Sequence, residues 1–363
     1  MLSVIIPTRN RAERLEHALR SLAQQTLSPS NFEIIVVDNG SRDRTSAVVA
    51  QIEKTSVHSI RYVYEASPGL HVGRHYGLRE ANGDIVVFID DDIEAFPTLL
   101  STIVVAFENP RIALVGGKCL PRYEGRVPEW LGAMWAPNAQ GERILGYLSL
   151  IDLGELPKFV NPLLVFGCNF SVRRSVLVEA GGFHPDGMPQ RHIRFRGDGE
   201  TYVSRYIAAK GYKAFYHPGA SVFHHVSRSR MTIEYLCQRA YNQGISNSYT
   251  EIRTTHGLDS DTQSSIGLTQ RSNSIWARAR RKKIREIIVT MRNRATRLLQ
   301  IRSRSTAEEL IEPEDEYLGA IAAAYEAGYA FHQKAVQESE MLLAWVLRPD
   351  YWDAQVPDEG TYN

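Results

Sequence analysis

The sequence predicts an α/β fold, with a mostly parallel central sheet flanked by helices and followed by a helical C-terminal extension. Three observations lead to this prediction. Short apolar runs rich in β-branched residues alternate with segments of helical spacing along the first 120 residues. Polar residues directly follow several of these runs. Beyond about residue 231, helical spacing continues with few strand signals. Because strands and helices alternate, the crossovers should be right-handed and the strands mostly parallel.

The predicted elements can be placed in chain order. Strands are expected at 2–6, 32–37, 60–64, 85–89, 112–117, 166–172 and 213–216, and helices at 45–52, 69–80, 98–108, 173–180, 201–210 and 316–345. A further helix, after the loop 8–11, carries Leu15, Leu19 and Leu22 at helical spacing. The segment 121–162 has prolines, glycines and no clean period, so we expect an irregular insertion there, such as a binding loop or a lid.

The bulk composition excludes several classes of protein. A chain of 363 residues is long for one domain, which suggests a large domain with an appendage. The formal net charge of +1 gives no support to a nucleic-acid partner. Three cysteines, odd in number and far apart along the chain, suit a reducing compartment and argue against a disulfide framework or a zinc site. No signal peptide or membrane-spanning run is evident, so we expect a cytoplasmic protein that is peripheral to a membrane at most.

Three consecutive carboxylates, Asp90, Asp91 and Asp92, end the apolar strand 85–89. Clustered carboxylates repel one another and raise one another's pKa unless a cation neutralises them. A divalent cation with a preference for oxygen ligands, Mn²⁺ or Mg²⁺, is the simplest such partner, and these ions commonly share their ligands with substrate phosphates. The alternative is a solvated acidic turn or a helix N-cap.

Polar residues at 8–10 and 38–41 follow the first and second strands as the acids follow the fourth. In parallel sheets, ligands bind outside the carboxyl ends of the strands. The sequence therefore predicts one binding site built from these three loops.

Ordered motifs along residues 1–235 resemble those of family 2 inverting glycosyltransferases with the GT-A fold, a Rossmann-like architecture. The motifs are VIIPTRN at 4–10, VVDNGSRDRT at 36–45, GRHYG at 73–77, FIDDD at 88–92, GCN at 167–169, GGF at 181–183, GDGE at 197–200, and Pro218 followed by His224. The resemblance implies transfer of a sugar from a nucleotide diphosphate, with UDP expected, to a hydroxyl acceptor such as a saccharide or a lipid-linked glycan. It also implies a nucleotide-sugar and metal half at 1–117, an acceptor-binding half at 118–235, and a separate helical region at 236–363.

The resemblance assigns roles to the acidic triplet. Asp92 is expected to bind the metal directly. Asp91 is expected as a second metal ligand, or on the donor ribose or a metal-bound water, and Asp90 is expected beside the nucleotide sugar in support of both. His224 is expected as an additional metal ligand. A buried structural role remains open for Asp90, and equally for His224.

The same resemblance assigns the nucleotide pocket. Thr8, Arg9 and Asn10 should line it, while Pro7 is expected only to end the first strand. Asp38 should accept a hydrogen bond from the uracil ring, with Asn39 beside it, and Arg74 should face the diphosphate. The alternatives are an Asx turn at Asp38 and a surface arginine at Arg74.

Inversion needs one general base and no enzyme nucleophile. The resemblance places this base in the motif Gly197-Asp198-Gly199-Glu200, where Gly199 separates two acids that are more often adjacent in the family. The base is therefore ambiguous, and Asp198 is preferred with Glu200 second. A helix N-cap aspartate followed by a glutamate in the first turn would explain the same spacing.

Two rival functions and one weaker feature stay open. A nucleotidyltransferase shares the α/β architecture, although the loop after the first strand lacks the glycines of its phosphate loop. A non-catalytic nucleotide-sugar-binding protein would need no base. An arginine-rich helix at 278–302 could contact an anionic membrane surface or pack against the domain.

Overall fold

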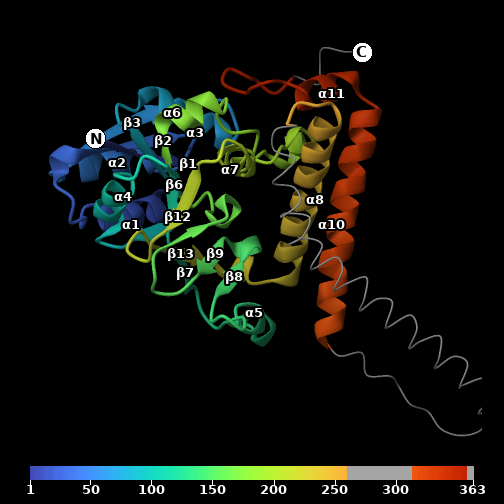
Figure 1. The fold of residues 1–363 in the computed structure, drawn as a ribbon, viewed down its shortest axis with the longest axis horizontal. Helices are drawn as coiled ribbons and strands as arrows, with labels where there is room; N and C mark the ends of the chain where they lie inside the picture. The colour runs from blue at the N-terminus through green and yellow to red at the C-terminus, as the bar shows by residue number, and fades with distance from the viewer. Residues whose placement is uncertain (260–312, 358–363) are drawn as a thin grey trace, which may run out of the picture.

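A computed structural model describes residues 1–259 and 313–357 and confirms the α/β fold. An eight-stranded sheet at its centre has the strand order β10-β12-β6-β11-β4-β1-β2-β3 (Figure 1). The strands β1, β2, β3 and β4 are parallel to their neighbours in that group, whereas β11 is antiparallel to both β4 and β6. The strands are β1 (Leu2–Thr8), β2 (Phe32–Asp38), β3 (Ser59–Tyr64), β4 (Ile85–Ile89), β6 (Ile112–Gly116), β10 (Lys158–Val160), β11 (Asn169–Arg173) and β12 (Lys213–Tyr216).

Helices cover both faces of this sheet because successive strand residues point in opposite directions. In β1, Val4 and Ile6 pack toward one set of helices while Ile5 packs toward the other. The first set comprises α1 (Ala12–Leu22), α2 (Thr45–Glu53) and α4 (Leu99–Ala106). The second comprises α3 (Leu70–Glu80), α6 (Arg174–Glu179) and α7 (Glu200–Ala209). Two buried layers of aliphatic side chains thus hold the strand ends at fixed positions.

The prediction that Pro7 ends the first strand is wrong. Strand β1 continues through Pro7 to Thr8, and these residues pair with Val37 and Asp38 of β2. Proline cannot donate to the strand ladder, but β4 pairs with β1 only as far as Ile5, so one side of β1 is free at Pro7. The extra residues bring Thr8 level with Asp38 at the carboxyl edge of the sheet.

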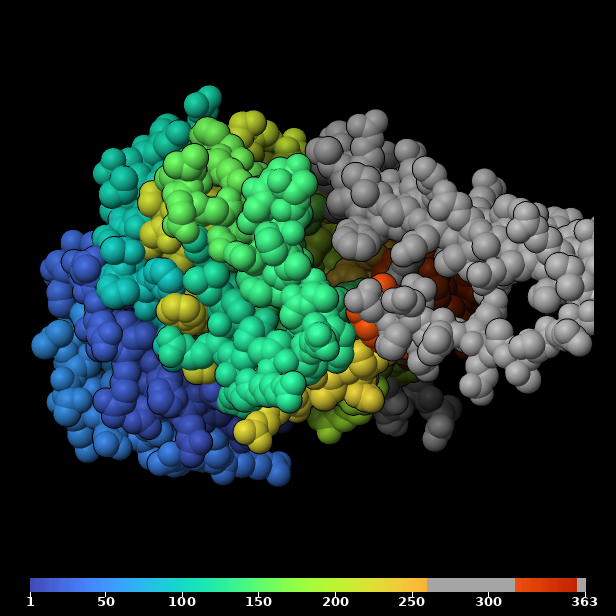
Figure 2. Space-filling view, turned by 90° about the horizontal axis from the view of Figure 1, so that it is seen from below, coloured from blue at the N-terminus to red at the C-terminus, as the bar shows by residue number. Residues whose placement is uncertain are grey.

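A second, five-stranded sheet occupies much of the segment predicted as irregular, so that prediction is wrong there. Its order is β5-β13-β7-β9-β8. The strands are β5 (Ile93–Ala95), β7 (Cys119–Tyr123), β8 (Arg143–Leu145), β9 (Leu150–Asp152) and β13 (Val222–Val226), and helix α5 (Glu129–Met134) lies between β7 and β8. These strands have only three to five residues, too few to give a clear alternating pattern. Figure 2 shows this green segment as a continuous mass beside the blue N-terminal half.

Helices α8 (Ile233–Thr255), α10 (Pro313–Gln337) and α11 (Glu340–Val346) form the C-terminal region, which begins close to the predicted boundary at 235. Figure 1 shows α8 and α10 lying side by side. A side chain at Gly244 would lie 2.1 Å from the Tyr325 carbonyl, and one at Gly328 would lie 2.0 Å from the Tyr241 carbonyl. The two glycines therefore permit the close approach of these helices.

The described residues also contain short 3-10 segments: η1 (Pro29–Asn31), η2 (Gly146–Leu148), η3 (Pro162–Leu164), η4 (Gln190–Phe195) and η5 (Arg228–Arg230). Among the helices of the described ranges, none is long and apolar enough to cross a membrane. The predicted basic helix at 278–302 lies outside the described residues.

Candidate active site

Three potential metal ligands meet where β4 ends and β13 passes. One ligand atom from each of Asp90, Asp92 and His224 lies within 4.8 Å of the others. Asp92 and His224 are buried, whereas the Asp90 side chain is 32% exposed. The strand-end position brings the two carboxylates out of the sheet, and β13 of the second sheet supplies the imidazole.

The orientation of His224 suits metal binding. Its Nδ1 atom lies 2.9 Å from the Leu148 carbonyl oxygen, which can only accept, so Nδ1 carries the proton. The Nε2 atom lies 3.3 Å from Asp92 Oδ1. Burial opposes a charge on the ring, but the Asp92 carboxylate outweighs it and raises the pKa of His224 to about 9. A carbonyl that fixes one ring nitrogen while the other faces a carboxylate is the usual support of a metal-binding histidine.

The donor set fits the predicted cation. Two carboxylates with one imidazole suit Mn²⁺, and the carboxylates alone suit Mg²⁺. The buried Oδ1 atom of Asp92 has the His224 ring as its charged neighbour, at 3.3 Å. A buried carboxylate needs such a neighbour, and a divalent cation would take this place once His224 has lost the proton on Nε2, so these residues fit a divalent cation.

Asp91 turns away from this cluster. Its carboxylate accepts hydrogen bonds from Thr8 Oγ1 at 2.7 Å and from Arg11 Nη1 at 2.9 Å. Burial raises the pKa of Asp91 to about 6, although Arg11 opposes this shift. The same Arg11 atom lies 3.2 Å from Asp92. The geometry thus groups Asp90, rather than Asp91, with Asp92 and His224, and it adds Arg11, which the sequence did not single out.

The predicted nucleotide loops meet at the ends of β1 and β2. The Asp38 carboxylate is buried and accepts hydrogen bonds from the Ser41 amide and the Tyr62 hydroxyl, both at 2.7 Å. The Ser41 bond is a local side-chain-to-backbone contact like the one that the alternative for Asp38 predicted, but it spans three residues rather than the two of an Asx turn. Tyr62 was not predicted. Asn10 has a φ of +53° and accepts from the Arg42 amide at 2.7 Å.

Asn39 and Arg9 differ in their surroundings. The Asn39 amide donates to the Glu65 and Ser67 carbonyls at 3.2 and 2.6 Å, and its oxygen accepts from the Gly69 amide. Asn39 therefore ties the loop after β2 to the start of α3. Arg9 is exposed beside these loops.

Arg74 of α3 links the two groups of acids. Its guanidinium is buried and lies 3.7 Å from Asp90 and 3.4 Å from Glu200. It also donates to the Gly167 carbonyl at 3.0 Å and lies over the Phe183 ring. A buried guanidinium between two carboxylates is held rigidly, so the prediction that Arg74 is part of the site agrees with this position.

The two acids of the Gly-Asp-Gly-Glu motif point to different places. Asp198 is buried and accepts hydrogen bonds from Thr250 Oγ1 at 2.9 Å, His184 Nδ1 at 2.7 Å and Arg205. Burial opposes ionisation, but Arg205 and His184 outweigh it and lower the pKa of Asp198. Glu200, at the start of α7, accepts from the Gly167 amide at 3.2 Å. The Asp198 carboxylate thus accepts three hydrogen bonds within the protein, whereas the Glu200 carboxylate has fewer such partners.

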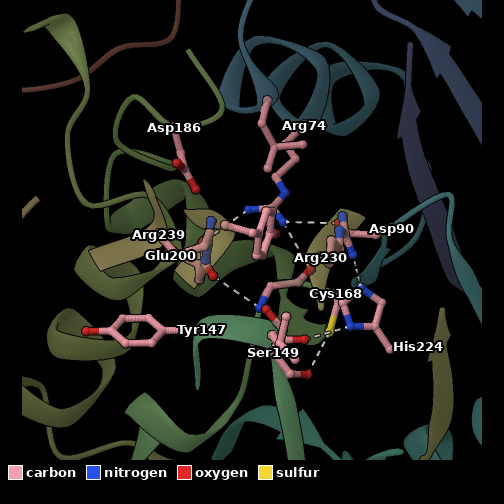
Figure 3. Close-up of a pocket in the computed structure, with 14 residues that line it drawn as sticks. Arg74, Asp90, Tyr147, Ser149, Cys168, Asp186, Glu200, His224, Arg230 and Arg239 are labelled. Carbon is pink, nitrogen blue, oxygen red and sulfur yellow. Dashed lines mark hydrogen bonds and ion pairs between the residues drawn. The ribbon is translucent and has the colours of Figure 1, made fainter. Parts of the chain in front are cut away.

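Glu200 lines a single cleft together with Asp90 and His224 of the metal cluster, and this cleft has a volume of about 110 Å³ (Figure 3). Asp92 and Asp198 are not part of its wall. The wall consists of Leu70, Arg74, Asp90, Tyr147, Leu148, Ser149, Gly167, Cys168, Asp186, Glu200, His224, Arg230, Tyr235 and Arg239. Among these, sequence reasoning missed Tyr147, Asp186, Arg230, Tyr235 and Arg239. Their segments carry no recognisable motif, and the only available signal was that three of them follow His224 closely in the chain.

Comparisons with known proteins agree on one family. Residues 3–180 match the model of glycosyl transferase family 2. A validoxylamine A glucosyltransferase of Streptomyces hygroscopicus subsp. limoneus is 36% identical over 130 residues, which cover 35% of this chain and 28% of that relative. A glucosyl-dolichyl phosphate glucuronosyltransferase of Haloferax volcanii is 25% identical over 249 residues, 68% of this chain and 75% of that relative. The chain therefore spans less than a third of the first relative's length.

A solved structure shares the fold. The mannosyltransferase PcManGT of Pyrobaculum calidifontis, in complex with GDP-Man and Mn²⁺, superimposes with a TM-score of 0.54 and 18% identity. The superposition covers 92% of this chain and 86% of that one. At this identity the likeness concerns the fold, which extends into the C-terminal region.

Proposed function

We propose a reaction for this chain from one premise: the chain belongs to glycosyl transferase family 2 through its residues 3–180 and has the GT-A fold. It transfers a sugar from a nucleoside diphosphate, with UDP as the expected nucleotide, to a hydroxyl acceptor, with inversion at the anomeric carbon. One observation carries the proposal. A single cleft has Asp90 and His224, which form a cluster with the buried Asp92, at one end and Glu200 at the other, with Arg74 in contact with Asp90 and Glu200.

Asp90, Asp92 and His224 would hold Mn²⁺ or Mg²⁺ at the donor end of the cleft. A bound divalent cation supplies positive charge that stabilises the diphosphate leaving group. Arg230 lies 3.1 Å from Asp92 and so faces the same position. Together with Arg74 it provides guanidinium groups that suit a diphosphate.

The remaining predicted donor residues form the wall around the nucleotide. Thr8, Asn10, Asp38 and Asn39 lie at the adjoining ends of β1 and β2, where the base and ribose of a nucleotide would bind. Arg9 is exposed at the same edge. Asp91, held by Thr8 and Arg11, would face the ribose from beneath.

Glu200 is the better candidate for the general base. It lines the cleft, and within the described part of the chain its side chain is held by contacts with Gly167 and Arg74. Asp198 is surrounded by three hydrogen-bond donors, and its lowered pKa makes it a weak base. We therefore assign proton removal from the acceptor hydroxyl to Glu200, and to Asp198 the role of a positioning residue.

A donor screen tests the proposal. Purified protein with Mn²⁺ is given a panel of nucleotide sugars, and released nucleotide is measured. One donor, a UDP-sugar, should release nucleotide, and EDTA should abolish the release. The configuration of the transferred sugar, measured by NMR, should be opposite to that of the donor. Equal nucleotide binding with and without EDTA, or retention of configuration, would contradict the proposal.

A further inference from the structure

The start of α8 forms one wall of the cleft. Thr232 caps this helix by accepting a hydrogen bond from the Tyr235 amide at 3.1 Å, which fixes where the helix begins. Tyr235 and Arg239 are four residues apart and therefore lie on the same face. Both line the cleft. The capped helix thus presents an aromatic ring and a guanidinium together to the substrate.

Arg239 is not matched by an acid as the other arginines of the cleft are. Arg74 pairs with Asp90 and Glu200, and Arg230 pairs with Asp92. Within residues 1–259 and 313–357, no carboxylate forms an ion pair with Arg239, and its buried Nε atom has no hydrogen-bond acceptor. A buried N–H without an acceptor is unfavourable, so this guanidinium is suited to an acceptor supplied by a ligand.

Asp186, an acid that interacts electrostatically with Arg239, does not fill this role. Asp186 lies 2.6 Å from Arg196, which already pairs with its Oδ1 atom. Burial opposes ionisation of Asp186, but Arg196, Arg74 and Arg239 together lower its pKa. The charge of Arg239 therefore acts on Asp186 from a distance without forming a direct contact.

Arg239 lies toward the base end of the cleft. His224, Arg230, Tyr235 and Arg239 follow one another in the chain, and all four line the cleft. In Figure 3, Arg239 lies on the same side as Glu200, away from His224. The residues around it should therefore contact the acceptor rather than the donor diphosphate.

We propose that Arg239 and Tyr235 bind an anionic group of the acceptor, the carboxylate of a uronic acid or a phosphate on a sugar, next to the hydroxyl that is glycosylated. This inference rests on the proposed function. The guanidinium fork makes paired hydrogen bonds to either anion. The Tyr235 ring offers an apolar face for the sugar that carries it.

The experiment compares matched sugars on the full-length protein loaded with Mn²⁺ and the nucleoside diphosphate that the donor screen selects. Methyl glycosides of glucose, galactose and N-acetylglucosamine are tested against the corresponding methyl uronides and sugar 1-phosphates by calorimetry. At least one anionic member should bind about tenfold or more tightly than its neutral partner, as expected for a charge-assisted pair. Preferred binding of the uronides would identify a carboxylate as the anionic group, and preferred binding of the sugar 1-phosphates would identify a phosphate.

The variant Arg239→Gln should abolish this preference for anionic sugars. Its dissociation constants for the neutral sugars and for the nucleotide should stay within about twofold of the wild-type values. Arg239→Lys should retain part of the preference. Arg20→Gln, which removes an exposed arginine paired with Glu16 on α1, is the matched control. It should change neither the preference for anionic sugars nor the affinity for the nucleotide. The inference fails if no anionic sugar binds more tightly than its neutral partner. It also fails if Arg239→Gln weakens nucleotide binding and leaves the preference for anionic sugars unchanged. Failure of the proposed function would appear separately, as a wild-type protein that releases no nucleotide from any donor.

Discussion

The two acidic motifs of the cleft, one at each end, separate their acids in the same way. At the end of β4, Asp90 and Asp92 form the metal cluster with His224, and Asp90 lines the cleft, while Asp91 binds Thr8 and Arg11. At the start of α7, Glu200 faces the cleft while Asp198 is buried among three donors.

The cause of the separation differs between the two ends. In the triplet, Asp91 and Asp92 lie in the turn that joins β4 to β5, and this turn directs neighbouring side chains to different partners. In the other motif, Gly199, with a φ of +55°, turns the backbone between the two acids. In the triplet, Asp90 and Asp92 are available for metal binding while Asp91 holds the loop in place, and in the other motif Glu200 is available while Asp198 does so. Two substitutions at each end therefore test whether this division of roles is correct.

The largest effect is expected for Glu200→Gln. Loss of a general base lowers turnover by about 10²–10⁴-fold, whereas the carboxamide keeps the shape of the side chain. Donor affinity should change little, because the metal cluster is at the other end of the cleft. Steady-state rates and calorimetric nucleotide binding measure the two effects. Wild-type turnover in this variant would show that Glu200 is not the base, and the roles given to Glu200 and Asp198 would then be wrong.

Asp198→Asn should act on stability instead. Breaking one partner of a buried ion pair costs about 3 kcal/mol or more in the free energy of unfolding, and urea denaturation measures it. The pKa of Asp198 is lowered on folding, so the wild type should lose stability as pH falls below about 4, and the variant should lack this component. Glu16→Gln, at an exposed pair on α1, is the control and should leave the midpoint unchanged. A stable Asp198→Asn protein with abolished turnover would instead make Asp198 the base.

The sequence predicts the N-terminal part of this fold better than the rest. The runs at 32–37, 60–64 and 85–89 are apolar and rich in β-branched residues, and each forms a strand of the sheet within two residues of its predicted ends. Strands such as β8 and β9 have three residues and acquire their structure from pairing with distant segments. Local composition carries too little information about such pairing.

The same contrast applies to the site. Asp90, Asp92 and Glu200 could be found because they lie in recognisable motifs next to predicted elements. Arg239 could not be found, because it lies one helical turn beyond Tyr235 in an ordinary helix, and only the folded chain places it in the cleft. The sequence also could not decide between Asp198 and Glu200, since the partner Thr250 comes from a helix 52 residues further along the chain.

At the metal end, a smaller effect is expected. Asp92→Asn should weaken Mn²⁺ binding at least about tenfold, as loss of ligand-supporting groups does in other metal sites. Asp91→Asn should weaken it by no more than about threefold, because Asp91 lies outside the cluster. Calorimetric titration of Mn²⁺ in the presence of nucleotide compares the two. A larger loss of Mn²⁺ affinity for Asp91→Asn than for Asp92→Asn would support the sequence-based prediction that Asp91 is a metal ligand. The two motifs would then not divide their acids in the same way.

The smallest effect is expected for Thr8→Val, which removes the hydrogen bond to Asp91 and keeps the shape of the side chain. Leaving one oxygen of a buried carboxylate without this donor should destabilise the protein by about 1–2 kcal/mol. Turnover at saturating donor should remain within about threefold of wild type, because Arg11 still holds Asp91. Urea midpoints and steady-state rates give the two values. If Thr8→Val lowered turnover as strongly as Glu200→Gln, then Asp91 and its hydrogen-bond partners would take part in the reaction. The division between reactive and structural acids would then be wrong.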